Sequence, residues 1–179
     1  MEGQLNDEDR ALLYNSVLEL KPANIFEVGT FKGGGSTLQL ARGLKENGKG
    51  VLFTCEIDFE RYNQAASGFF NEYPELYRLI NFQRGAALEV FPSILRAEGK
   101  ADMVFMDGCD DGQTNLDEFK MFEPYMRPGS VFLMHDWGCL KASMVRPYLE
   151  KNKDFEILKV HEFVSVESGR VGMVKAVRK

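Results

Sequence analysis

The stretch IFEVGTFKGGG, residues 25–35, joins a short apolar run to a carboxylate and then to a run of glycines. A short apolar run that ends in turn residues is typical of a buried strand. Glu27 stands near the end of this run, and Gly29 follows two residues later. Glycines in such a turn let the backbone approach a ligand closely. The stretch therefore predicts a ligand site at the carboxyl end of the first strand of a sheet.

Four further apolar runs of similar length follow at intervals, at residues 51–55, 79–82, 103–106 and 131–134. The segments between them carry apolar residues at helical spacing. Strands that alternate with helices predict βαβ units and a mainly parallel sheet. A leading helix is expected over residues 7–20, within an N-terminal helix region 1–22, with Asn6 as its cap.

The end of the chain departs from this alternation. Residues 155–163 and 170–177 are both strand-like, and only a short polar connection separates them. A parallel return needs a crossover of about a dozen residues, so these two strands must form an antiparallel hairpin. The sequence thus predicts five parallel strands followed by a closing hairpin.

Composition limits the classes of function. A chain of 179 residues is expected to form one domain, residues 1–179. Its 22 basic and 27 acidic side chains are scattered and give a net charge of −5, so we expect no nucleic-acid partner. No apolar segment approaches the ~20 residues of a membrane span and no signal peptide is recognisable, which predicts a cytoplasmic protein without membrane contact.

The three cysteines, Cys55, Cys109 and Cys139, are odd in number and include no CxxC pair. They indicate neither a zinc cluster nor a complete disulfide framework, and we interpret them as small buried residues.

The position of Glu27 bears on the class of ligand. A dinucleotide site also uses a glycine-rich turn after a first strand, but it offers a helix N-terminus to a pyrophosphate. A carboxylate close to that turn would repel the pyrophosphate. Glu27 therefore favours a ligand that carries positive charge.

Five segments together resemble one enzyme family. FEVGTFKGGGSTLQLA (26–41), FTCEID (53–58), NFQRGAA (81–87), ADMVFMDG (101–108) and RPGSVFLMHDW (127–137) resemble motifs of class I S-adenosylmethionine-dependent methyltransferases. The likeness is strongest to small O-methyltransferases of the catechol and caffeoyl-CoA type. It implies a Rossmann-like α/β fold with a seven-stranded sheet in the order 3-2-1-4-5-7-6, strand 7 antiparallel, and helices on both faces.

The resemblance also implies a set of residues that bind S-adenosylmethionine. Glu27 and the loop 29–36 would hold the methionine part, Glu56 the ribose hydroxyls, and residues 85–86 the adenine side. The complete expected set is Glu27, Gly29, Thr30, Phe31, Gly33, Gly34, Ser36, Glu56, Ile57, Gly85, Ala86 and Asp107.

Alternatives stay open at several of these positions. Glu27 could be a solvated strand end, Glu56 could be a surface charge with Asp58 in its place, and Ser36 could cap the following helix. The family usually spaces this motif as ExGxxxGxS, and this chain has one extra residue, so either Gly33 or Gly34 fills the turn. Ala86 stands where the family often has an acid that meets the adenine amino group.

Acids at the ends of the fourth and fifth strands bind Mg²⁺ in the metal-dependent relatives. The resemblance places Asp107 and Asp136 there, with Asp110 as a further candidate ligand. A hydrated acidic loop is the alternative. Asp110 stands where the family often has Lys or His, and Trp137 stands where it often has Asn.

Proton transfer needs a base, and His135 lies where the fifth strand should meet the cofactor. A structural histidine is the alternative reading. Trp137 and Phe31 either wall the acceptor pocket or pack in the core. His161 falls in the hairpin and is assigned no catalytic role.

The sequence thus predicts an O-methyltransferase whose catalytic residues are His135, Asp107 and Asp136, acting on a small hydroxylated molecule such as a sugar or phenol. The absence of an Asn/Asp-Pro-Pro-Tyr segment and of a Pro-Cys nucleophile disfavours methylation of nucleic acid. An inactive S-adenosylmethionine-binding module and an NAD-dependent oxidoreductase are the alternatives. The identity of the methyl acceptor stays open, and so does the question of whether the protein forms a homodimer.

Overall fold

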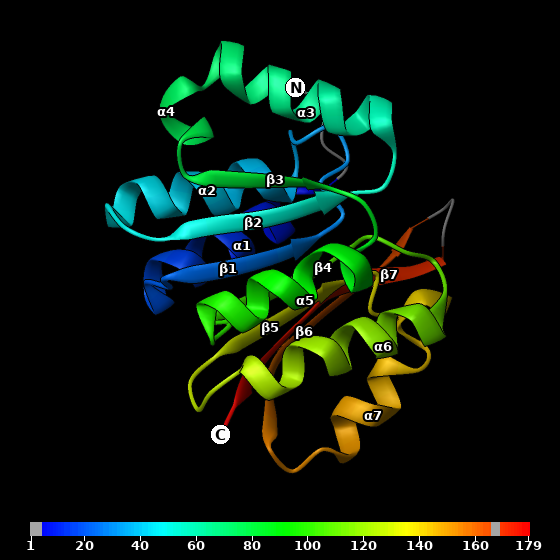
Figure 1. Ribbon diagram of the computed structural model, residues 1–179. Coiled ribbons are helices and arrows are strands. Elements are labelled where there is room, and N and C mark those ends of the chain that lie inside the picture. The colour runs from blue at the N-terminus through cyan, green and yellow to red at the C-terminus, as the bar shows by residue number, and fades with distance from the viewer. Residues whose placement is uncertain (1–4, 166–168) are drawn as a thin grey trace. The chain divides into compact units, whose positions relative to one another are not determined.

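The computed structural model describes residues 5–165 and 169–179, which divide into two compact units, one up to Val90 and the other from Phe91 (Figure 1). The strands follow the order β3-β2-β1-β4-β5-β7-β6. This is the predicted order, with the predicted antiparallel β7, so the expected methyltransferase-type sheet is confirmed. Among the described residues, no helix is both long and apolar enough to cross a membrane.

The first unit contains three parallel strands in the order β3-β2-β1. Its elements are α1 (Asp7–Leu20), β1 (Asn24–Val28), α2 (Ser36–Asn47), β2 (Val51–Glu56), α3 (Phe59–Glu72), α4 (Pro74–Tyr77), β3 (Ile80–Arg84) and the first turn of α5 (Ala87–Glu98). Every residue of β1 is buried, as expected of a parallel strand covered on both faces. Glu27 of β1 pairs in register with Thr54 of β2, and Val28 pairs with Cys55.

The predicted first helix and its cap are confirmed. The Asn6 side chain accepts a hydrogen bond of 2.8 Å from the Asp9 backbone N–H at the start of α1. This bond satisfies one of the N–H groups that a helix start leaves unpaired. The buried residues Leu13 and Val17 of α1 face inward, and α1 packs on α2.

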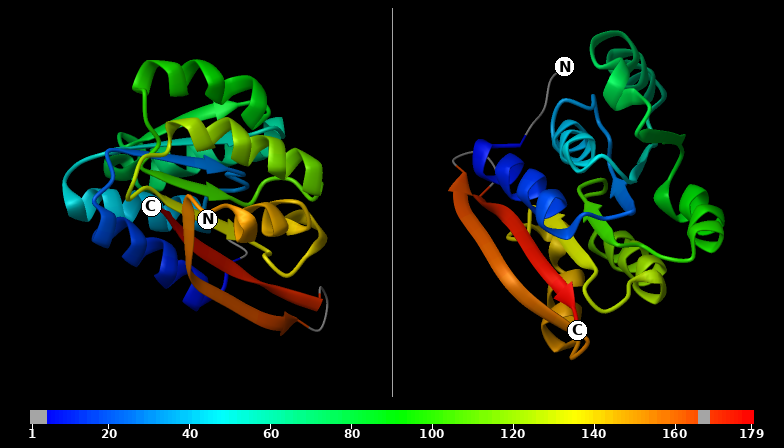
Figure 2. Two further views of the ribbon diagram at one scale, coloured as in Figure 1. Left: turned by 90° about the horizontal axis from the view of Figure 1, so that it is seen from below. Right: turned by 90° about the vertical axis from the view of Figure 1, so that its left-hand side faces the viewer.

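The second unit contains two parallel strands and a long hairpin. Its elements are the rest of α5, β4 (Met103–Met106), α6 (Gly112–Phe122), η1 (Glu123–Tyr125), β5 (Val131–His135), η2 (Leu140–Ala142), α7 (Val145–Lys151), β6 (Phe155–Ser165) and β7 (Gly169–Arg178). β4 runs parallel to β5, whereas β7 runs antiparallel to both β5 and β6. Figure 2 shows β6 and β7 as a long, twisted ribbon.

Aromatic side chains form much of the core of the second unit. The Phe119 ring of α6 lies 4.7 Å from the Phe132 ring and 5.5 Å from the Phe155 ring, measured between centroids. Phe119 and Phe132 are fully buried. These contacts join α6 to β5 and β6, and so fix the strand that carries His135.

The cysteine interpretation is correct only in part. Cys55 is buried in β2, but Cys109 and Cys139 are half-buried and all three are free thiols. The reason is their position, because Cys109 follows β4 and Cys139 follows β5, in loops rather than in buried strands.

Candidate functional site

The loop after β1, residues 29–35, is called the glycine loop below. The backbone N–H groups of Gly29 and Thr30 both donate to the Cys55 carbonyl at the end of β2, over 3.2 and 3.0 Å. Gly29 has a φ of 96°, a conformation that suits glycine. The loop is therefore tied by its backbone to the carboxyl end of the neighbouring strand.

Gly33, rather than Gly34, takes the left-handed conformation in this loop. Its φ is 81°, and a Cβ added there would lie only 2.8 Å from the Phe69 ring of α3. Both facts require glycine at this position. The ambiguity between the two glycines is thus resolved in favour of Gly33 as the turn residue.

The interpretation of Ser36 as a helix cap is wrong. The N-cap of α2 is Gly35, which has no side chain to accept a hydrogen bond, and Ser36 is the first helical residue. The helix therefore begins one residue earlier than a Ser36 cap would require. Ser36 is buried, and its predicted contact with a donor stays a prediction.

Glu27 is not a solvated strand end, because it is fully buried. Its Oε2 accepts hydrogen bonds from the hydroxyls of Thr37 at 2.7 Å and Thr54 at 2.6 Å. The Thr54 hydroxyl also lies 2.5 Å from that of Thr30. These bonds join β1, β2, α2 and the glycine loop around one buried carboxylate.

Glu56 ends β2 and is 6% exposed. Its Oε2 accepts from the backbone N–H of Phe31 at 2.8 Å, and its Oε1 accepts from the backbone N–H of Asp58 at 2.9 Å. Each oxygen keeps a second lone pair, because a carboxylate offers about four acceptor positions. Glu56 is therefore a buried carboxylate of fixed orientation rather than the surface charge of the alternative reading.

Asp58, the proposed substitute for Glu56, has a different role. Its side chain accepts from the backbone N–H of Arg61 at 2.8 Å and so caps α3.

The predicted adenine-side residues follow β3. The Gly85 backbone N–H donates to the Glu56 carbonyl at 3.0 Å, and Gly85 has a φ of 141°. Ala86 is half-buried and accepts backbone hydrogen bonds from the first turn of α5. Ile57, directly after Glu56, is 74% exposed. The first unit thus brings Glu56 and Gly85 together, with an exposed apolar side chain beside Glu56 in the sequence.

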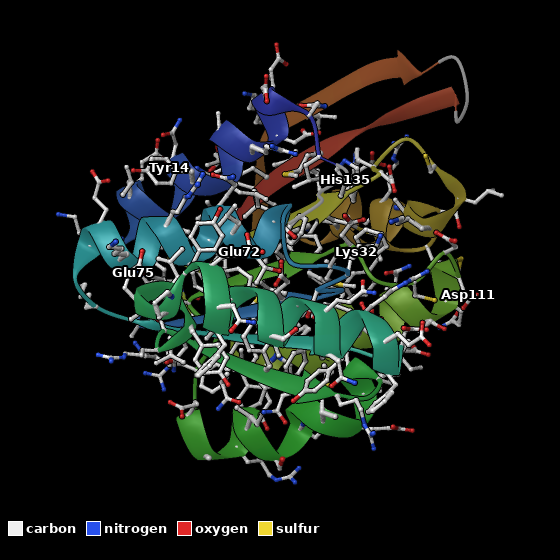
Figure 3. The ribbon with its side chains drawn as sticks, turned by 90° about the horizontal axis from the view of Figure 1, so that it is seen from above. Tyr14, Lys32, Glu72, Glu75, Asp111 and His135 are labelled. Atoms are coloured by element: carbon white, nitrogen blue, oxygen red, sulfur yellow. The ribbon has the colours of Figure 1, made fainter. Side chains whose placement is uncertain are left out.

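In the second unit, four side chains form what is called the Lys141 cluster: Asp107, His135, Asp136 and Lys141. The Lys141 Nζ lies 2.7 Å from Asp107 Oδ1 and 2.8 Å from Asp136 Oδ2. The His135 Nδ1 lies 3.4 Å from Asp107 Oδ1 and 3.3 Å from Asp136 Oδ1. The structure therefore brings the three predicted catalytic residues together, and it adds a lysine that the sequence analysis did not identify. Figure 3 labels His135 together with Asp111, which caps α6.

The charges of this cluster stabilise one another. Burial by itself raises the pKa of Asp136, but hydrogen bonds from His135 and Lys141 outweigh it and hold that pKa well below its ordinary value. Burial by itself lowers the pKa of Lys141, but the attraction of Asp107 and the hydrogen bonds to both carboxylates raise it well above its ordinary value. Lys141 is thus held as an ammonium and Asp136 as a carboxylate.

The backbone at Asp136 is unusual, with a φ of 54° in a residue that is not glycine. Such a conformation costs on the order of 1 kcal/mol and persists where the surroundings enforce it. Phe31 in the glycine loop has a φ of 51°. The sequence analysis predicts Phe31 as a donor-binding residue and Asp136 as a catalytic residue, so both unusual conformations occur at predicted site residues.

The cluster does not suit Mg²⁺ as it stands. One ligand atom from each of Asp107, His135 and Asp136 lies within 4.8 Å of the others, a spacing that could hold an ion. However, the Lys141 ammonium already binds a carboxylate oxygen of both aspartates. A cation between them would meet an ammonium at close range, and this repulsion outweighs the favourable spacing of the ligand atoms.

The other candidate metal residues do not complete a site. Asp110 is exposed, and Asp111 accepts from the Thr114 N–H and hydroxyl, both at 2.8 Å. Trp137 is 2% exposed, which supports core packing rather than a pocket wall. Phe31 is half-buried, with the Arg61 guanidinium 5.0 Å from its ring centroid. The His161 side chain lies outside the described residues.

An open pocket of about 750 Å³ adjoins the Lys141 cluster. Its lining residues all belong to the second unit: Asp110, Asp136, Gly138, Cys139, Leu140, Lys141, Ser143 and Arg146. A second open pocket of about 610 Å³ lies over α1 and α2 and contains none of the predicted residues. The candidate chemistry belongs with the larger pocket, because Asp136 and Lys141 of the Lys141 cluster line it.

Lys141 carried no signal in the sequence. It stands 34 residues after Asp107, and a single lysine in a loop gives no motif. The one indication was indirect, since the neighbouring carboxylates Asp107 and Asp136 require a positive charge to offset their repulsion.

Comparisons with known proteins agree with this fold. An O-methyltransferase from Bacillus cereus in complex with SAH superposes with a TM-score of 0.80 at 23% identity, covering 98% of this chain and 83% of that one. The O-methyltransferase TomG from Streptomyces achromogenes in complex with SAM gives 0.81 at 24% identity, covering 98% and 82%. A putative caffeoyl-CoA O-methyltransferase from Staphylococcus aureus gives 0.74 at 16% identity, covering 98% and 85%.

No curated protein matches the sequence. Residues 26–137, however, match the sequence model of a family described as a methyltransferase domain, and they make up more than half of the chain. The chain therefore belongs to the methyltransferase domain family, and the protein is a methyltransferase.

Proposed function

We propose that this protein transfers a methyl group from S-adenosylmethionine to an oxygen of a small hydroxylated molecule. The observation that carries the proposal is the Glu56 carboxylate, which two backbone N–H bonds hold at the end of β2. The names of the similar solved structures, O-methyltransferases in complex with SAM or SAH, support it.

The first unit would bind the donor. Glu56 Oε1 and Oε2 each have a lone pair available for a ribose hydroxyl, which is the contact that this acid makes in the resembling family. Gly29 and Gly33 give the glycine loop a backbone that can approach the methionine part closely. The remaining predicted contacts of this unit, from Glu27, Thr30, Phe31, Gly34, Ser36, Ile57, Gly85 and Ala86, are proposals of the same kind. The donor contact predicted for Asp107, which belongs to the second unit, stays a prediction from the sequence.

The donor supplies an electrophilic methyl group on a sulfonium, and the sulfur keeps the electron pair when the bond to carbon breaks. The acceptor oxygen must lose its proton as the new bond forms. We propose that His135 receives this proton. Its Nδ1 faces Asp107 and Asp136, so an Nδ1–H bonded to a carboxylate would leave the Nε2 lone pair as the acceptor.

Three further expectations remain predictions from the sequence: a single domain over residues 1–179, a cytoplasmic location and a small-molecule acceptor. Whether the protein forms a homodimer stays open. Divalent-metal assistance receives no support from the Lys141 cluster, because an ammonium already binds both aspartates.

Two variants test the proposal at separate steps. Glu56→Gln should weaken S-adenosylmethionine binding at least about tenfold, because it removes the charge from hydrogen bonds to two hydroxyls. His135→Gln should bind the donor as the wild type does but lose most methyl transfer. Calorimetric titration measures the first effect. A screen of phenols and sugars with labelled S-adenosylmethionine measures the second.

The matched control is Glu75→Gln, which changes an exposed glutamate of α4 labelled in Figure 3. It should leave donor binding unchanged. Donor binding without transfer to any acceptor would instead favour the inactive binding module. Binding of NAD in place of S-adenosylmethionine would contradict the proposal.

A further inference from the structure

Lys141 reaches both aspartates because the chain after β5 folds back on itself. The Cys139 backbone N–H donates to the Asp136 carbonyl at 2.9 Å, and the Ala142 N–H donates to the Cys139 carbonyl at 3.1 Å. These turns form η2 and direct Lys141 toward the end of β5. The Lys141 side chain is 7% exposed, so burial restricts it to this position.

We propose that Lys141 takes the place of a divalent cation in this protein, so that methyl transfer proceeds without a metal. Its ammonium binds Asp107 Oδ1 at 2.7 Å and Asp136 Oδ2 at 2.8 Å, one oxygen from each acid that the family resemblance assigns to Mg²⁺. The catalytic consequence rests on the proposed function, whereas the occupation of the position by Lys141 does not.

Charge and distance make the ammonium and the metal exclusive alternatives. Mg²⁺ requires oxygen ligands at about 2.0–2.1 Å in a nearly octahedral arrangement. One oxygen of each carboxylate, Asp107 Oδ1 and Asp136 Oδ2, is already bonded to Nζ. Two carboxylates and one ammonium leave a net charge of −1, and a divalent ion would turn it to +1 while placing two cations side by side.

The replacement changes what the acceptor must offer. A metal ion can bind two vicinal hydroxyl oxygens and so select catechol-like molecules. An ammonium that already donates to two carboxylates cannot chelate such a pair. We therefore infer that acceptors with one hydroxyl are used as readily as those with two adjacent hydroxyls.

The test uses Mn²⁺ as the probe, followed by electron paramagnetic resonance on the full chain without donor or acceptor. The wild type should bind no Mn²⁺ at a specific site. Lys141→Ala and the bulkier Lys141→Met should each gain one specific Mn²⁺ site, filled at Mn²⁺ concentrations at which the wild type binds none, because the two carboxylates are then available. Lys141→Arg keeps the charge and should not bind.

Adding Asp136→Asn to Lys141→Ala should abolish the new site. The control is Lys45→Ala, which removes an exposed lysine that pairs with Glu75. Circular dichroism establishes that the variants are folded. The proposal would be overturned if the wild type bound one equivalent of Mn²⁺ and Asp136→Asn abolished that binding. This outcome can be observed without any Lys141 variant. Folded Lys141→Ala and Lys141→Met proteins without a Mn²⁺ site would overturn it too.

A parallel titration with S-adenosylmethionine separates this inference from the proposed function. If the wild type did not bind S-adenosylmethionine, the proposed function would be refuted, but the Mn²⁺ result would still stand. With active enzyme, EDTA should not reduce the rate, and a phenol should be methylated at a rate similar to that of a catechol. Metal-dependent activity of the wild type would contradict metal-free transfer.

Discussion

Gly33 is the residue of the glycine loop at which substitution should cost most. Gly33→Ala places a Cβ at a φ of 81° and 2.8 Å from the Phe69 ring, so it combines backbone strain with a steric clash. We expect a loss of about 2–4 kcal/mol in the free energy of unfolding, measured by urea denaturation. Because the loop must move, donor affinity should fall as well.

Gly48 provides the matched control for this prediction. It has a φ of 67° at the end of α2, but a Cβ there would meet nothing within 4 Å. Gly48→Ala should therefore cost only the left-handed conformation, about 1 kcal/mol, without changing donor affinity. Equal costs at the two positions would show that the contact with Phe69 is unimportant.

Individual site residues differed in how far the sequence could place them. The position of Glu56 could be predicted, because an acid that ends the apolar run of a parallel strand lies at the carboxyl edge of the sheet. The turn residue could not be chosen between Gly33 and Gly34, because φ depends on how the loop meets Phe69 of α3. Lys141 could not be foreseen, because its contact with Asp107 spans 34 residues and depends on tertiary structure.

At the scale of elements, α1 and α2 depend on the absence of a side chain at Gly43. A Cβ added there would lie 2.7 Å from Val17 Cβ and 2.8 Å from Val17 Cγ1. Val17 is fully buried in α1. The two helices therefore approach closely at this point.

Gly43→Ala should destabilise the protein by about 1–3 kcal/mol, although alanine normally favours a helix by about 1 kcal/mol over glycine. The Val17→Gly background tests the cause, since it removes both Val17 atoms, Cβ and Cγ1, that a Cβ at position 43 would meet. In that background Gly43→Ala should cost clearly less, as a double-mutant cycle by thermal unfolding will measure. An additive cycle would rule out the contact as the cause.

The strands were predicted within one or two residues because buried parallel strands give continuous apolar runs, as in β4 over Met103–Met106. The hairpin followed from the short connection alone. The start of α2 was misplaced by one residue. Both serine and glycine occur as helix N-caps, so the local sequence does not decide between Ser36 and Gly35.

At the scale of the whole molecule, the dependence of stability on pH reflects groups with shifted pKa values. The pKa of Asp136 is lowered in the folded state, so its contribution is present above the ordinary value of 3.8 and is lost as the pH falls. Glu118 of α6 acts in the opposite direction, because burial raises its pKa from 4.5 to about 7. Glu118 is 4% exposed, and its Oε2 has no hydrogen-bond partner among the described residues.

Between pH 4.5 and about 7 the folded protein holds a proton on Glu118 that the unfolded chain releases. Stability must therefore fall as the pH rises through this window, because charging a buried carboxyl disfavours the folded state. Glu118→Gln removes the charge but keeps the shape. It should raise the free energy of unfolding by about 1–3 kcal/mol at pH 8 and have little effect at pH 5. Urea denaturation at both pH values measures the difference. The control is Asp117→Asn, at an exposed neighbouring position of α6, which should leave the pH dependence of stability unchanged. If the Glu118→Gln protein still loses as much stability between pH 5 and pH 8 as the wild type does, another group causes the pH dependence.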